Sequence, residues 1–245
     1  MTTHTTAPSY TGFRFPQEII AHAVWLYFRF KLSFWDVEEL LTARGVIVTH
    51  ETVRHHCRTF EQEYANRLRR RRAQPGDKWH LDEVFLKING TRHYLWRAGD
   101  HDGTVLDIQS RRNKVAAKTF LRKLLKGCTD VPRVLITDKL GSYAAAKQEV
   151  MPRVEHRRHR RLNNRAENSH QPARQRERTM RHFKSSGHAQ RFLSAFGPIR
   201  EHFCLRRHRL RAEEYRRARA QRFQVWTEVS GLQMAAWPSN GRLDP

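Results

Sequence analysis

A carboxylate inside an apolar strand is the feature that most constrains how this chain folds. Asp82 lies within the largely apolar run Trp79–Leu86, and a second such run, Val134–Thr137, leads directly into Asp138. A buried carboxylate costs free energy unless something neutralises it, and acids are scarce here, 24 against 47 lysines and arginines. Divalent cations would neutralise these acids, because Mg²⁺ takes carboxylate oxygens and keeps positions open for water and phosphate.

Glu167 adds a third acid, in the polar helical stretch 163–170. Two metal ions held by such acids clamp the attacking and leaving oxygens of a phosphodiester. The formal net charge of +23 calls for a polyanionic partner, and DNA or RNA is the first candidate. Together the acids and the charge indicate a chain that cuts or joins nucleic acid.

The rest of the composition argues against several other classes. A membrane-surface role would need a basic amphipathic helix beside an apolar anchor, and no apolar run approaches the roughly 18 residues of a membrane span. The first residues lack the basic-then-apolar layout of a signal peptide. Three cysteines without CxxC spacing favour a reduced, cytosolic protein, and the 15 histidines show no paired spacing for zinc.

The N-terminal part has the pattern of three helices. Residues 16–30 carry apolar side chains at helical spacing, Ser33 and Thr49 are expected N-caps, and Gly45 suits a helix stop. Two helices joined by a short turn that contains glycine are typical of a helix-turn-helix. The second helix is expected to present four basic side chains for DNA binding, with simple solvation as the alternative: His50, Arg54, His55 and Arg58.

From residue 78 onward the pattern alternates strands and helices. Asn89-Gly90 predicts a hairpin turn, Asp102-Gly103 a second turn, and Gly127 the end of a helix. The predicted strands are 78–88, 92–98, 105–110, 133–137 and 154–158, and the predicted helices are 114–126, 142–150, 163–178 and 187–206. Three successive strands, a crossover helix, a fourth strand and further helices describe an α/β ribonuclease-H-like (integrase-type) core.

Pro75-Gly76 interrupts the chain between these regions and is the expected domain boundary. We expect a flexible tail at 1–12, an all-α helix-turn-helix domain at 13–74, a ribonuclease-H-like catalytic domain at 75–211 and a basic C-terminal tail at 212–245. The arginines of the C-terminal tail either follow DNA or remain disordered.

Nine short motifs occur together along residues 12–205. They are Phe15–Ile20, Asp36–Leu41, Arg44–Val46, Val48–Val53, Trp79–Glu83, His93–Ala98, Thr137–Lys139, Leu162–Glu167 and Phe183–Ser185. In this combination they resemble the DDE transposases of the IS6 family of bacterial insertion sequences. The 28 residues between Asp138 and Glu167 are fewer than is usual in that family, which a shortened loop explains.

The resemblance implies a DNA transposase in which Asp82, Asp138 and Glu167 form the catalytic triad. These acids would bind two Mg²⁺ ions, with Mn²⁺ as an alternative. The implied reaction is cleavage at the ends of the element and transfer of the freed 3′-hydroxyl into target DNA, without a small-molecule substrate. The implied partners are the element's terminal inverted repeats, target DNA and further copies of the chain in a homodimer or higher oligomer, with no membrane. The expected location is the bacterial cytoplasm, in association with the nucleoid.

Residues near the triad have competing interpretations. Glu83 is expected to point to the opposite face of its strand from the first acid and is not predicted as a ligand. His170 and Arg174 lie three and seven residues after Glu167, so all three share a helix face. We therefore predict that Arg174 is catalytic and contacts a phosphate beside the metals, with solvation as the alternative. Trp96 is predicted to be a core residue rather than a base-stacking platform.

Other assignments stay open at this point. Asp82 also fits a salt-bridged core acid and Asp138 a turn residue, and Glu155 and Glu177 are rivals of Glu167 for the third position. Two other functions fit as well: a ribonuclease-H-like nuclease without strand transfer, and a DNA-binding repressor descended from a decayed transposase. The helix-turn-helix argues against the first, and the intact acid triad argues against the second.

Overall fold

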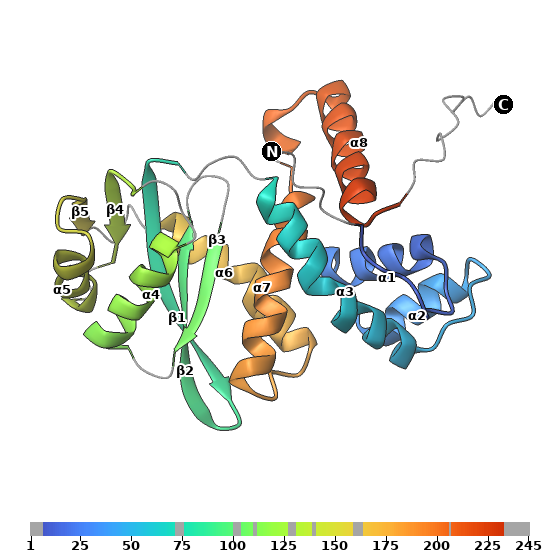
Figure 1. Cartoon of the computed structure of the whole chain (residues 1–245), viewed down its shortest axis with the longest axis horizontal. Helices are drawn as coiled ribbons and strands as arrows, with labels where there is room; N and C mark the ends of the chain where they lie inside the picture. The colour runs from blue at the N-terminus through green and yellow to red at the C-terminus, as the bar shows by residue number, and fades with distance from the viewer. Residues whose placement is uncertain are drawn as a thin grey trace.

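The computed structural model describes residues 7–71, 76–99, 104–109, 112–126, 131–138, 141–158, 164–205 and 207–232. Figure 1 shows a sheet with its covering helices on one side and a group of helices on the other, with α7 between them. The N-terminal helices and the C-terminal helix lie together, although they are far apart in the sequence.

The N-terminal helices are α1 (Gln17–Arg29), α2 (Phe34–Thr42) and α3 (His50–Arg70). Ser33 caps α2 in a capping box with Asp36, and the Thr49 hydroxyl accepts a hydrogen bond of 3.3 Å from the amide of Thr52 at the start of α3. Gly45 takes a positive φ of 78° in the turn between α2 and α3, a conformation that glycine adopts without strain. The predicted caps and helix-turn-helix elements are therefore confirmed.

The sheet has five strands in the order β3-β2-β1-β4-β5. They are β1 (Lys78–Ile88), β2 (Thr91–Gly99), β3 (Thr104–Gln109), β4 (Val134–Thr137) and β5 (Glu155–Arg158). The first three strands are antiparallel, and β1, β4 and β5 are parallel. Asn89 and Gly90 both have positive φ between β1 and β2, as the predicted tight hairpin requires.

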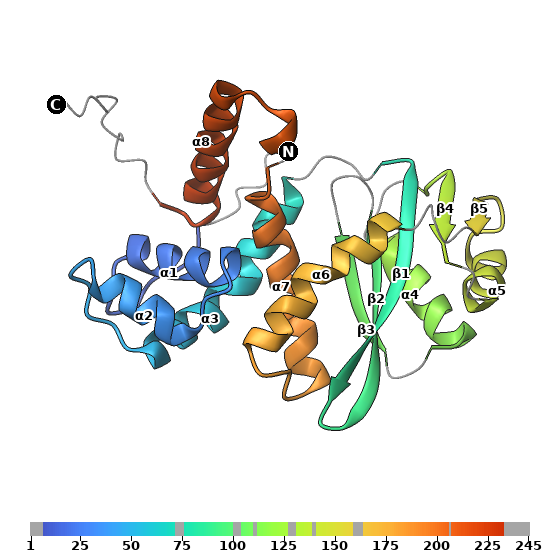
Figure 2. The ribbon, with the colours of Figure 1, turned by 180° about the vertical axis from the view of Figure 1, so that it is seen from behind.

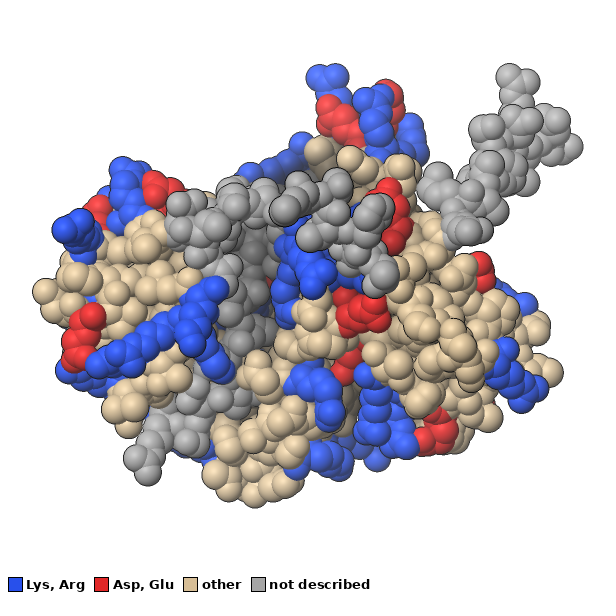
Figure 3. Space-filling model, in the orientation of Figure 1, with Lys and Arg blue, Asp and Glu red and all other residues tan. Residues whose placement is uncertain are grey.

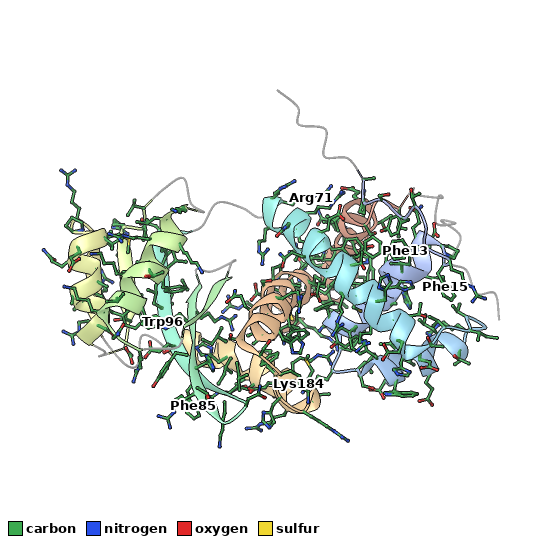
Figure 4. The ribbon with its side chains drawn as sticks, turned by 60° about the horizontal axis from the view of Figure 1, so that its bottom comes forward. Phe13, Phe15, Arg71, Phe85, Trp96 and Lys184 are labelled. Atoms are coloured by element: carbon green, nitrogen blue, oxygen red, sulfur yellow. The ribbon has the colours of Figure 1, made fainter. Side chains whose placement is uncertain are left out.

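Helices cover both faces of the sheet. In Figures 1 and 2, α4 (Lys114–Lys126) lies on one face, whereas α6 (Asn164–Thr179) lies on the other, and α5 (Gly141–Val150) lies beside α4. Trp96, which Figure 4 labels on the sheet, is fully buried. Its ring lies 5.8 Å from that of Phe120 on α4, which confirms it as a core residue. With the strand order above, this arrangement is the predicted ribonuclease-H-like fold.

A second hydrophobic core joins the sheet to the helices at both ends of the chain. It contains Leu86, Ile88 and Leu95 from the sheet together with apolar side chains of α1, α3, α7 (Ser186–His202) and α8 (Ala212–Val229). Figure 4 shows Phe13 and Phe15, which pack against this core, beside the N-terminal helices. The division of the chain into domains at residues 75–76 stays a prediction, because residues 72–75 lie outside the described part.

The C-terminal segment differs from the expected tail. Residues 207–209 form a short 3-10 helix, and α8 is an 18-residue helix whose Trp226 and Val229 are buried near its C-terminal end. The sequence pattern did not reveal this helix, because apart from Tyr215 its large apolar side chains lie in its second half, although arginine itself favours helix. The predicted turn at 102–103 and helix end at Gly127 fall outside the described residues. Among the described helices, none combines the length and the apolar composition that crossing a membrane requires.

Candidate active site

The register of the sheet brings the first two acids together. β1 and β4 run parallel, with Lys78 paired to Val134 and His80 to Ile136. Continued for two residues, this register brings Asp82 beside Asp138, which directly follows β4. Asp82 is buried, whereas Asp138 is partly exposed at the carboxyl end of its strand. The two acids therefore meet at one point on the edge of β1.

Helix α6 reaches Asp82 from the face of the sheet opposite to α4. The Nε2 atom of His170 lies 2.9 Å from Oδ2 of Asp82, and both side chains are buried. Glu167 precedes His170 by three residues on the same helix. The side chain of Glu167 lies outside the described part of the structure.

The side chain of Glu83 lies on the opposite face of the sheet from that of Asp82, as the alternation of side chains along a strand predicts. Its carboxylate accepts hydrogen bonds from the Tyr143 hydroxyl on α5 and from Arg112. Burial raises the pKa of Glu83 to about 7; the hydrogen bond from Tyr143 lowers this pKa, and the charge of Asp138 raises it. β4 ends at Thr137, so the edge of β1 is open beyond it, and single carboxylate oxygens of Asp82, Glu83 and Asp138 lie within 4.8 Å of one another. The exclusion of Glu83 as a ligand therefore stays a prediction.

Arg112 is a site residue that sequence reasoning missed. It forms a salt bridge with Glu83, and its Nη2 atom lies 3.4 Å from Oδ2 of Asp138. Its side chain is 40% exposed, so the guanidinium reaches solvent while it holds the two acids. No local signal could have singled it out among 47 lysines and arginines, because its role depends on how the chain folds.

The remaining predicted site residues have separate positions. Arg174 is exposed on α6 and forms no ion pair with any residue in the described ranges. Glu155 is exposed on β5, where it pairs with Arg157, and Glu177 lies near the far end of α6, 3.5 Å from His182. Neither rival acid is therefore next to Asp82.

The four predicted DNA-binding residues lie along the first half of α3. His55 and Arg58 are exposed, and Arg54 is half-buried and pairs with Glu51. The ring of His50 stacks on Trp35 of α2 with 3.6 Å between centroids, and Trp35 is 62% exposed. Figure 3 shows arginine and lysine side chains spread over the visible face of the molecule, with fewer acidic ones between them.

The fold and the acidic edge define a DDE-type domain. A family model described as a DDE domain, that of the IS240-type transposases, matches residues 76–206. Because this match covers more than half of the chain, the chain belongs to that family of DDE domains.

Relatives in bacteria agree with this assignment. The chain is 35% identical over 144 residues to the transposase of insertion sequence element IS257 in transposon Tn4003 of Staphylococcus aureus, and equally to the transposase of the insertion sequence-like element IS431mec of that species. Each alignment covers 56% of this chain and 62% of the relative. An uncharacterised protein of Yersinia pseudotuberculosis, pYV0051, is 39% identical over 77 residues, which are 30% of this chain and 72% of that protein. The resemblance to the IS6 family is thereby confirmed.

Solved structures of two retroviral proteins also align with the chain. A simian T-cell lymphotropic virus intasome structure gives a TM-score of 0.38 at 14% identity, over 64% of this chain and 63% of that chain. The HTLV-2 integrase catalytic core, solved with magnesium, gives 0.32 at 17% identity, over 40% and 68% of the two chains.

Proposed function

We propose that this chain is a DNA transposase that cuts the ends of an insertion sequence and transfers them into target DNA. The observation that carries the proposal is the meeting of Asp82 and Asp138 on the edge of β1, beside α6, the helix that contains Glu167. The position of Glu167 in the triad rests on the family motif and on the helix face that it shares with His170.

The donor set suits divalent metal ions. Carboxylate oxygens from Asp82, Glu83 and Asp138 come within 4.8 Å of one another, and hard cations such as Mg²⁺ prefer oxygen ligands. We assign Asp82, Asp138 and Glu167 as ligands of two Mg²⁺ ions, for which Mn²⁺ can substitute. When bound, such ions stabilise the charge on the attacking and leaving oxygens of the phosphodiester.

The surrounding side chains position the acids and the DNA. His170 holds one oxygen of Asp82, which leaves the other oxygen of that carboxylate for a ligand. Arg112 orients Asp138 and offers its exposed guanidinium to a phosphate. Arg174 projects into solvent one helical turn beyond His170, where a DNA backbone on this face would meet it.

The partners follow from the same proposal. The helix-turn-helix binds the terminal inverted repeats through His50, Arg54, His55 and Arg58, and the active site takes target DNA. Two ends must be joined, so the chain acts as a homodimer or higher oligomer on DNA. Its proposed location is the bacterial cytoplasm, at the nucleoid.

The test is cleavage of DNA that carries the element's ends, in Mg²⁺. Asp82→Asn, Asp138→Asn and Glu167→Gln are each expected to abolish cleavage and leave end binding nearly intact, because binding comes mainly from basic residues. Asp77→Asn is the matched control, because Asp77 is an exposed acid just before β1 that pairs with Arg133 away from the site. Cleavage at the wild-type level by any of the three variants would remove that residue from the triad.

Two further measurements separate the alternatives. Mn²⁺ should raise the melting temperature of the wild-type protein and not that of Asp82→Asn, which tests metal binding without catalysis. Joining of a labelled 3′-hydroxyl end to a target plasmid distinguishes a transposase from a nuclease that only hydrolyses. A protein that binds the element's ends but neither cleaves nor joins DNA would be a repressor.

A further inference from the structure

Arg176 is a buried cation at the junction of α6 with the N-terminal helices. Its side chain is 1% exposed, and its guanidinium carbon lies 4.2 Å from the ring centroid of Tyr27 on α1 and 5.8 Å from that of Phe192 on α7. The Nη1 atom donates a hydrogen bond of 2.6 Å to the carbonyl oxygen of Leu32. One side chain of α6 is thus in contact with three other segments of the helical core.

Packing alone does not account for this arginine. Its Nε and Nη2 atoms are buried without a well-aligned acceptor, although the guanidinium interacts with the Tyr27 hydroxyl. No carboxylate in the described ranges forms an ion pair with it. Burial of a guanidinium without a counter-ion disfavours the folded state, and burial lowers the pKa of Arg176. Contact with the two aromatic faces offsets only part of this cost. An apolar side chain of similar volume would fill the same space at lower cost.

The two ends of α6 contact different functional parts. Near the N-terminal end of α6, His170 forms a hydrogen bond with Asp82. Six residues later, Arg176 donates a hydrogen bond to the carbonyl oxygen of Leu32. Leu32 directly precedes Ser33, the N-cap of α2, so the acceptor is attached to the start of the helix-turn-helix. Six residues of α-helix span about 9 Å. Figure 2 shows α6 running from the sheet toward the helices.

Pro172 makes the connection within α6 weaker than in an uninterrupted helix. It lies inside the helix between His170 and Arg176. Proline has no backbone N–H and its ring crowds the preceding turn, so one backbone hydrogen bond is lost there. The position of the N-terminal half of α6, which contacts Asp82, therefore depends on how the C-terminal half is anchored.

We propose that Arg176 is a positioning residue that couples DNA bound on the helix-turn-helix to the active site. This inference rests on the proposed function. A shift at the start of α2 moves the Leu32 carbonyl, Arg176 follows it, and α6 carries this movement to the residues beside Asp82. Binding of a correct end thereby sets the place of the third acid.

The test compares Arg176→Met, which keeps the packing volume and removes the charge, with Arg178→Met, an exposed position two residues further along α6. Arg176→Met should bind end DNA within about twofold of wild type and melt at the same or a higher temperature. Its cleavage rate at saturating end DNA should fall by roughly tenfold to a hundredfold, because small misplacements of catalytic groups have effects of that size. Arg178→Met should cleave like wild type.

Hydrogen exchange provides a measurement that does not require cleavage. End DNA, and not random DNA, should protect the amides of residues 164–170 in the wild-type protein, and Arg176→Met should lose this protection. If the wild-type protein shows the protection but does not cut DNA, the proposed function fails and the coupling stands. The coupling would be overturned if Arg176→Met cleaved saturating end DNA at the wild-type rate. It would also be overturned if end DNA protected amides 164–170 equally in this variant and in the wild-type protein.

Arg176→Lys decides the question if the methionine variant does not fold. Lysine keeps the charge and one donor, but a single ammonium cannot lie flat on Tyr27 and reach the Leu32 carbonyl as the guanidinium does. Reduced cleavage with normal end binding supports the proposal, and a wild-type cleavage rate contradicts it.

Discussion

Glu61 is a buried carboxylate on the face of α3 that packs against α7. It is 5% exposed, and its nearest cation is Arg191 of α7, with 4.0 Å between Nε and Oε1. Burial raises the pKa of Glu61 to about 7, against the opposing charges of Arg191 and Arg58, which lower it. Folding therefore favours the protonated form of this side chain at mildly acidic pH.

The sign of the effect follows from proton binding. An unfolded chain loses this proton near pH 4.5 and the folded protein near pH 7, so the folded state binds more protons between these values. Stability contributed by the raised pKa is present below pH 4.5 and is lost as the pH rises to about 7. The difference between the unfolded pKa of 4.5 and the folded pKa of about 7 changes the free energy of unfolding by at most about 3 kcal/mol. Glu61→Gln removes the charge and keeps the shape, so it should stabilise the protein by up to about that amount at pH 8.

Urea unfolding at pH 4.5, 6 and 8 measures this difference. The free energy of unfolding of Glu61→Gln should match the wild type at pH 4.5 and exceed it increasingly toward pH 8. Glu63→Gln is the control, because Glu63 is on the same helix but only half-buried, and it pairs with Arg67. A constant difference between Glu61→Gln and wild type across the three pH values would refute the reasoning.

Three other changes have defined outcomes. Replacing Arg54 and Arg58 with alanine should weaken binding of end DNA and flatten its salt dependence by about one unit of log–log slope per lost phosphate contact, and an unchanged slope would assign both to solvent. Arg174→Ala should reduce strand transfer at equal DNA occupancy far more than Arg219→Ala, which removes the same charge from α8; equal losses would make Arg174 part of the general positive field. Trp96→Ala should destabilise the folded protein by about 3–5 kcal/mol in urea unfolding, and a loss under about 1 kcal/mol would mean that the core refills the space.

Local patterns predicted most of the elements, because local chemistry determines them. Ser33 and Thr49 cap helices through their own side chains, and Asn89-Gly90 supplies the positive φ values of a hairpin. The acids at 82 and 138 were predictable for a similar reason, since an acid in or after a buried strand is unusual in its own sequence context.

Contacts between distant segments were not predictable in this way. Arg112 gains its role only because β4 ends beside β1, and Arg176 only because α6 packs against the loop after α1. Helical spacing and the family resemblance singled out Arg174, which is exposed, whereas the arginine two residues later is the buried one. Among so many arginines, burial separates one from another, and burial is a property of the fold.

Helix α3 is one uninterrupted element of 21 residues, about 32 Å long. Its first half carries the proposed DNA-reading side chains, and its second half is fixed to α7 through Gln62 and Arg69. Substitutions of the exposed side chains in the first half can change the recognised end sequence without disturbing the core. A one-residue insertion between the halves is different, since it would rotate the reading face by about 100° relative to the acids. Descendants of this protein should therefore acquire new end sequences by exchange of side chains and should keep the length of α3 constant.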